Sequence, residues 1–99
     1  MNPYEYISPT ELSRSIADKL RERRLSLGWK QSTLAERSGV SLGSLRRFES
    51  QGLISLSSLL SLAMALGHLD DFTCLFDAPK AMTLKELEDR GTTNQRGRL

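Results

Sequence analysis

Residues 31–49, with the sequence QSTLAERSGVSLGSLRRFE, contain the pattern that decides the fold. Their first part, residues 31–38, places apolar Leu34 and Ala35 beside charged side chains, as an amphipathic helix does. Gly39 follows directly, and a residue just past a helix end often takes a left-handed backbone that only glycine adopts easily. The pattern therefore predicts a short helix that ends at Gly39.

A second short helix is predicted directly after this turn. The Ser41 hydroxyl can cap it by accepting an amide hydrogen from its first turn. Leu45 and Phe48, three residues apart, lie on one side of that helix, while Arg46 and Arg47 lie towards another. Two helices this short cannot bury their own apolar faces, so flanking segments must complete a core. The second helix then lies outside that core, and an α-helix of this size fits the major groove of DNA.

The flanking segments predict further helices. The residues SPTE are typical of a helix start, with Ser8 as the cap, Pro9 in the first position and Glu11 completing a capping box. The helix that follows ends near Gly28, and one stripe on it contains Leu12, Ile16, Leu20 and Arg24. A later helix, closed by Gly67, has an apolar stripe formed by Leu56, Leu59, Leu60, Ala63 and Leu66.

Two more helices are expected towards the end of the chain. A fifth helix over residues 70–76 should fold Phe72, Leu75 and Phe76 back onto the core, with Ala78-Pro79 ending it. A short helix with a capping box should begin at Thr83 and run through about Arg90.

Length and composition set the outer limits. Ninety-nine residues fit one domain with a single modest core. We expect an N-terminal extension over residues 1–8, a helical domain over residues 9–77, and a short helix with a mobile basic tail over residues 78–99. Tyr4, Tyr6 and Ile7 leave two alternatives open, a short strand paired with a partner chain or a loose, disordered segment.

Several chemistries are excluded by residue types that are scarce. Cys74 is the only cysteine and His68 the only histidine, so neither an internal disulfide nor a Cys/His zinc site can form. Serines are plentiful, but one histidine and no Gly-Xaa-Ser-Xaa-Gly turn leave no nucleophile system. Adjacent Asp70 and Asp71 are typical of helix caps rather than metal ligands. We therefore expect no enzyme, no metal and no cofactor.

The chain contains no pattern of export or membrane insertion. Its start lacks the basic-then-apolar layout of a secretion signal. Residues 53–69 carry no formal charge, but serines interrupt them and they fall short of the ~20 apolar residues that a spanning helix needs. A buried helix of a cytoplasmic protein in a reducing compartment is the expectation.

The net charge of +2 hides a strong asymmetry along the chain. Residues 14–47 contain nine basic and three acidic side chains, a balance of +6. Residues 49–89 contain seven acidic and two basic ones, a balance of −5, and the last ten residues add +3. The half that contains the two short helices is therefore the half suited to phosphates.

The joint spacing of several residues resembles one family of regulators. These residues are Leu20, Arg24, Gly28, Gln31, Leu34, Ala35, Gly39, Val40, Ser41, Leu45, Glu49, Leu59, Ala65, Leu66 and Gly67. With this spacing, residues 16–69 resemble a Cro/repressor-type (XRE-like) helix-turn-helix regulator. The resemblance implies an all-α, lambda-repressor-like DNA-binding domain of five helices, acting in the bacterial cytoplasm on the nucleoid.

The resemblance also assigns DNA-contacting roles. Gln31 would bind a backbone phosphate with help from helix-end amides, the alternative being a simple cap. Lys30 stands where the family prefers Ser or Thr as a cap, and can lie beside a phosphate instead. Ser44 and Arg47 are expected at the DNA backbone, which fixes register without reading sequence. Trp29, in an apolar position of the family, should plug the joint between helices.

The base-facing positions of the family fall on Ser41, Leu42, Gly43 and Arg46. Neither Leu42 nor Gly43 offers a side-chain hydrogen bond, although Leu42 can touch a thymine methyl group and Gly43 permits close approach. Arg46 can take guanine O6 and N7 as a bidentate pair, so specificity would rest heavily on it. The alternative is a solvated or phosphate-bound arginine.

Two further implications concern assembly. In the family, the positions of Arg24 and Glu49 form a partly buried ion pair between the first and third helices. Such proteins normally pair as homodimers and read inverted repeats with half-sites about one turn of DNA apart. The residues from Phe72 to Phe76 and from Tyr4 to Ile7 are the candidate pairing surfaces.

Three function classes remain open. Residues 69–79, followed by TLKEL and a short Arg-rich tail, resemble HipB-type antitoxins, which are encoded beside HipA-like kinase toxins and repress their own operons. The first alternative is a stand-alone phage or bacterial repressor. The second is a protein-interaction module that has lost DNA binding. This alternative stays open because Leu42 and Gly43 offer no side-chain hydrogen bonds to bases.

Overall fold

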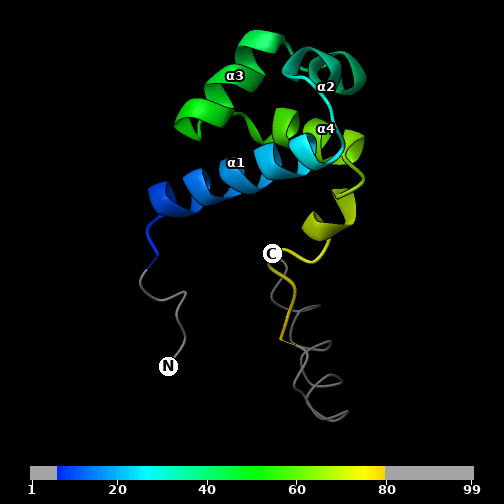
Figure 1. Cartoon of the computed structure of the whole chain (residues 1–99). Coiled ribbons are helices and arrows are strands. Elements are labelled where there is room, and N and C mark those ends of the chain that lie inside the picture. The colour runs from blue at the N-terminus through cyan, green and yellow to red at the C-terminus, as the bar shows by residue number, and fades with distance from the viewer. Residues whose placement is uncertain (1–6, 80–99) are drawn as a thin grey trace.

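The computed structural model describes residues 7–79, and over this range all regular structure is helical. The elements are α1 (Pro9–Ser26), α2 (Gln31–Ser38), α3 (Leu42–Gln51), α4 (Leu56–Ala65) and the 3-10 helix η2 (Leu69–Phe72). In Figure 1, α2 and α3 lie together at one end of the molecule, and η2 lies towards the other. α1 packs against α3, α2 packs against both α3 and α4, and η2 packs against α4.

Serine side chains cap the start of three of the four α-helices in the described range. The hydroxyls of Ser8, Ser41 and Ser55 each accept the amide hydrogen of the residue three positions on, at 3.1, 3.1 and 3.2 Å. α2 differs, because its first flanking residue is Lys30 and no side chain caps it. Gly39 ends α2 in the left-handed conformation, with φ 77°, as its position predicts. The helix-turn-helix over residues 31–51 therefore follows from local chemistry.

The core lies where α1, α2, α3 and α4 meet. Its largest fully buried side chains are Leu34, Leu45, Phe48 and Leu62. The smaller or slightly less buried members are Ala17, Leu20, Ala35, Val40, Ala63 and Leu66. Trp29 is half-buried and packs against this cluster, as expected for a plug at the joint between helices.

The predicted stripes of α1 and α4 are wrong at their first residues. Leu12 and Leu56 are 45% and 65% exposed, and Ala17 and Leu62 occupy buried positions in their place. Leu12 lies in the first turn of α1 and Leu56 begins α4, and burial starts only later in each helix. α4 carries no charge, and several of its stripes are equally apolar. The sequence of α4 alone therefore does not indicate that Leu62 is the buried residue.

The fifth helix expected over residues 70–76 is instead the single 3-10 turn η2 (Leu69–Phe72). After it, Phe76 has a positive φ of 65°, which stops helical continuation. Phe72 is half-buried, but Leu75 and Phe76 are exposed and do not fold back onto the core. The prediction for these two residues is therefore wrong.

Other expectations concern residues outside the described range. They are the strand or loose segment before Ile7, the helix from Thr83 to Arg90, and the basic tail from Gly91. Within the described range, no helix is both long and apolar enough to cross a membrane.

Gly52 ends α3 with φ 73°, and a β-carbon there would lie 3.2 Å from the Arg14 backbone nitrogen. We expect Gly52→Ala to destabilise the protein by about 2–3 kcal/mol, since it adds crowding against α1 to the ~1–2 kcal/mol of a left-handed alanine. Gly39→Ala is the matched control, because its φ is 77° and its β-carbon would meet open space. Urea unfolding measures the loss in the free energy of unfolding. An equal loss for both variants would show that crowding against Arg14 does not contribute to the effect of Gly52→Ala.

Candidate nucleic-acid interface

The outer face of α3 is uncovered by other described residues. Leu45 and Phe48 turn inward and are almost fully buried. Since successive residues of a helix are about 100° apart, Gly43 lies on the side opposite to them, and Arg46 and Arg47 lie one on each side of Gly43. All three residues are exposed. Both arginines are therefore available to a ligand, from different sides of α3.

Ser41 and Ser44 form the start of this surface. The Ser41 hydroxyl accepts the Ser44 amide hydrogen at 3.1 Å and donates its own hydrogen to Ser44 Oγ at 2.8 Å. Ser41 is thereby committed to capping α3, and the Ser44 hydroxyl keeps its hydrogen for another acceptor. Ser44 is thus the better placed of the two to donate to a phosphate.

Leu42 and Gly43 differ in how much they offer to a ligand. Leu42 is half-buried and packs against the core, so only part of it reaches the surface. Gly43 is exposed, and a β-carbon there would have no neighbouring atom within 4 Å. Gly43 is the second residue of α3, and nothing in the packing there requires a glycine. Its effect is to leave the outer face of α3 flat.

Behind this face lies a buried ion pair. Arg24 on α1 donates from Nε to Glu49 Oε2 at 2.8 Å and from Nη2 to Oε1 at 2.9 Å. Their side chains are only 7% and 4% exposed. Arg24 also donates from Nη1 to the Trp29 carbonyl at 2.8 Å, which attaches the link before α2. The expected pair is present, and it joins three segments rather than two.

Gln31 belongs to the same network. Its Nε2 donates to Glu49 Oε1 at 3.0 Å, so the side chain does not cap its own helix. The side chain is half-buried at the start of α2, beside α3. Lys30, the residue before it, is exposed. The structure therefore brings Gln31 to the ion pair, a contact that the sequence analysis did not foresee.

Two more arginines flank the two short helices. Arg14 Nη2 donates to the Ser50 carbonyl at 3.5 Å, which places a cation near the C-terminal end of α3. The Arg37 guanidinium lies 4.4 Å from the centre of the Trp29 ring, a cation–π contact at the end of α2. Both arginines are exposed. The basic character of this half therefore continues on either side of α3.

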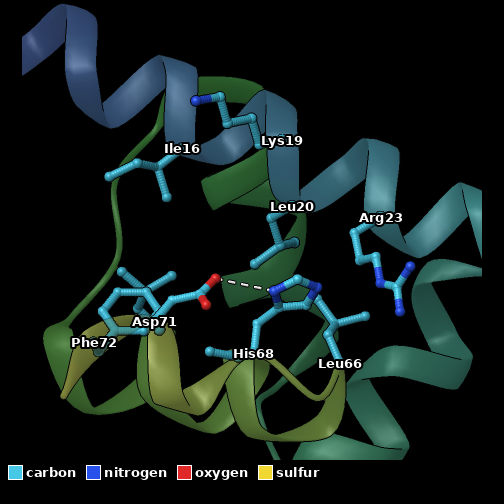
Figure 2. A pocket seen from close by; sticks show the side chains of 10 residues that line it. Ile16, Lys19, Leu20, Arg23, Leu66, His68, Asp71 and Phe72 are labelled. Atoms are coloured by element: carbon cyan, nitrogen blue, oxygen red, sulfur yellow. Dashed lines mark hydrogen bonds and ion pairs between the residues drawn. The ribbon is translucent and has the colours of Figure 1, made fainter.

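A groove of about 310 Å³ lies between α1, α4 and η2. Figure 2 shows Ile16, Leu20 and Phe72 on its walls, with His68 and Asp71 hydrogen-bonded at 3.0 Å. Lys19 and Arg23 also contribute to the lining. Most of this lining is apolar, so it suits a hydrophobic partner rather than phosphates. η2, which forms one wall of the groove, lies away from α3 in Figure 1.

This arrangement agrees with the comparison with protein families. The sequence model of the helix-turn-helix family HTH_3 matches residues 20–72, more than half of the chain. The chain belongs to the helix-turn-helix family. The family is one of DNA-binding transcription regulators, and the matched range contains α2, α3 and the ion pair. Comparison with curated proteins finds no match.

The family resemblance supplied the candidate DNA-contacting residues of this helix-turn-helix protein, but not their internal contacts. Ser41, Gly43, Ser44, Arg46 and Arg47 are exposed along α3, with Leu42 half-covered. The contacts of Gln31 with Glu49 and of Arg14 with Ser50 span 18 and 36 residues. No local pattern marks contacts of that range, so sequence reasoning had no signal for them.

The ion pair provides a stability test. We expect Arg24→Met to destabilise the protein by about 3–5 kcal/mol, because it leaves the Glu49 carboxylate buried without its partner. The double variant Arg24→Met/Glu49→Leu should recover a large part of that loss, since no unpaired charge remains. Chemical unfolding of the three proteins checks this. A single variant as stable as the wild type would contradict a buried pair.

Proposed function

We propose that this helix-turn-helix protein is a sequence-specific repressor that binds double-stranded DNA with α3 in the major groove. The observation that carries the proposal is the uncovered outer face of α3, flat at Gly43 and flanked by Arg46 and Arg47. Under this proposal the protein acts by occupying an operator, without catalysis and without a cofactor. Phosphate contacts supply most of the affinity, and base edges supply the choice of sequence.

The roles of the contacting residues are assigned from the resemblance to Cro/repressor-type regulators. Arg46 reads a guanine through O6 and N7, the only bidentate base contact that we assign to α3. Arg47, Ser44, Lys30 and Gln31 bind the DNA backbone and fix the register of α3. Ser41 caps α3 and Leu42 contacts a thymine methyl with the part of its side chain that is exposed.

We further propose that the repressor works as a homodimer on an inverted repeat, because one α3 reads only one half-site. Pairing through the η2 end would leave both α3 faces free. Leu75 and Phe76 support this choice, since Phe76 is 104% exposed and its φ of 65° is unfavourable for a bulky residue. The groove beside η2 offers an apolar surface for the same residues of a second copy.

A finer proposal is that the protein is the antitoxin of a HipA-like kinase and represses their shared operon. It rests on the resemblance of residues 69–79 and the following TLKEL to HipB-type antitoxins. The exposed Leu75 and Phe76 lie in this tract and would suit a protein partner. Co-purification with the product of the adjacent gene tests it. If the neighbouring genes form a phage lysogeny cluster, the stand-alone repressor is the better description.

Binding-site selection from a random duplex library tests base reading by α3. We expect the wild type to enrich an inverted repeat, and Arg46→Ala to lose the preference at one guanine position per half-site, a change of about 1–3 kcal/mol. Arg47→Ala is the matched control on the neighbouring position. It should weaken all sequences alike and lower the slope of log K against log salt by about one. If Arg47→Ala loses the guanine preference and Arg46→Ala keeps it, Arg47 reads the base and Arg46 binds the DNA backbone.

Gly43→Ala should separate stability from DNA binding. A β-carbon there meets no other atom, so we expect the substitution to stabilise the protein by about 0.5–1 kcal/mol through better helix propensity. The same methyl group would stand on the face that approaches DNA, so binding to the selected operator should weaken. Thermal unfolding and fluorescence anisotropy measure the two effects. A variant that binds DNA as tightly as the wild type would remove Gly43 from the interface.

A further inference from the structure

We propose that Glu49 is a positioning residue for DNA binding, because it holds the Gln31 amide with its nitrogen available to a phosphate. The inference rests on the proposed function and adds a residue that is itself too buried to touch DNA. It follows from the contact between Gln31 Nε2 and Glu49 Oε1 at 3.0 Å. It makes the buried ion pair part of the DNA-binding apparatus as well as of the fold.

The hydrogen-bonding groups of Gln31 and Glu49 allow only one orientation of the Gln31 amide. A carboxylate accepts hydrogen bonds and cannot donate them, so only the NH₂ group of Gln31 can face Glu49. A phosphate likewise offers only acceptors, so Gln31 can bind it only through Nε2. This nitrogen carries two hydrogens, and the bond to Glu49 uses one. The second is the hydrogen that a backbone phosphate would accept.

Without Glu49, the Gln31 amide could turn either its oxygen or its nitrogen towards DNA. If the amide oxygen faced a phosphate, two hydrogen-bond acceptors would meet and no hydrogen bond could form. Holding the amide in advance also avoids ordering the side chain when DNA binds. Glu49 itself does not move, because Arg24 holds both of its oxygens at 2.8 and 2.9 Å. The orientation of Gln31 is therefore determined by a buried pair.

A carboxylate near DNA would ordinarily repel the phosphates, but Arg24 neutralises the charge of Glu49. Glu49 and Arg24 form a neutral pair, so their net field at a neighbouring phosphate is small. Removing the Glu49 charge alone makes the protein more positive. Simple electrostatics then predicts tighter DNA binding for Glu49→Gln, whereas loss of positioning predicts weaker binding. The two explanations differ in sign.

A double-mutant cycle tests the proposal with wild type, Gln31→Ala, Glu49→Gln and the double variant. The probe is a fluorescein-labelled duplex of arbitrary sequence, because phosphate contacts do not depend on sequence. Glu36→Gln is the matched control, since it removes the charge of an exposed carboxylate on α2. Each protein is first shown to be folded by circular dichroism, and dissociation constants are measured by anisotropy.

We expect Gln31→Ala to weaken binding about three- to tenfold, the size of one hydrogen bond. Glu49→Gln should produce a similar loss when Gln31 is present and no further loss when it is combined with Gln31→Ala. Glu36→Gln should bind as tightly as the wild type or tighter. Because Gln31 is neutral, the salt dependence of binding should stay the same in Gln31→Ala. In NMR spectra, the side-chain NH₂ signals of Gln31 should shift in Glu49→Gln.

Equal weakening by Glu49→Gln in both backgrounds would overturn the proposal, because Glu49 would then act only through the fold. The proposal would also be overturned if Glu49→Gln bound DNA as tightly as Glu36→Gln does. If Glu49→Gln does not fold, Arg24→Met/Glu49→Leu replaces it in the cycle, since it removes the carboxylate that Gln31 contacts and leaves no buried charge without a partner. A wild type that binds no duplex overturns the proposed function itself, a result distinct from additive losses in a protein that does bind.

Discussion

A buried charge must be neutralised where it lies, and here Arg24 and Glu49 do this for each other. Their contact joins α1 to α3, and Arg24 also holds the carbonyl of Trp29 just before α2. The relative positions of the three helices therefore depend on one guanidinium. Since α3 has no apolar contact on its outer side, its orientation is set by Leu45, Phe48 and this pair. The position of the exposed outer face of α3 is therefore determined by the buried residues on its other side.

The molecule divides its surface between two kinds of chemistry. The end that contains α2 and α3 is basic and polar, and its exposed side chains suit a phosphate backbone. The end around η2 has an apolar groove and the exposed residues Leu75 and Phe76. In Figure 1 these ends lie apart, so a partner bound at η2 need not compete with a ligand on α3.

The sequence predicted the parts of the fold that local chemistry determines. Gly39 ends α2, Ser41 caps α3, and Leu45 and Phe48 are buried, because each depends on residues within a turn or two. The sequence-based predictions were wrong where burial depends on packing between helices that are distant in the sequence. The uncharged α4 offers several apolar stripes, and only packing against the rest of the domain selects Leu62 for burial.

The same limit applies to the last turn and to the candidate site. Apolar residues over 72–76 are compatible with a helix, yet the chain turns at Phe76 with a positive φ. Exposure of the α3 residues could be predicted from helical spacing. The bond from Gln31 to Glu49 could not, since it joins separate helices.

The flat start of α3 has a consequence for how such a protein can change its target. Gly43 has open space around it, and Leu42 uses only part of its side chain to complete the core. Longer polar side chains can therefore be introduced at position 43 without disturbing the packing or the ion pair. Under the proposed function, a substitution at this position would change the operator preference, while the stability of the fold is determined by other residues. This separation makes the domain a natural starting point for retargeted regulators.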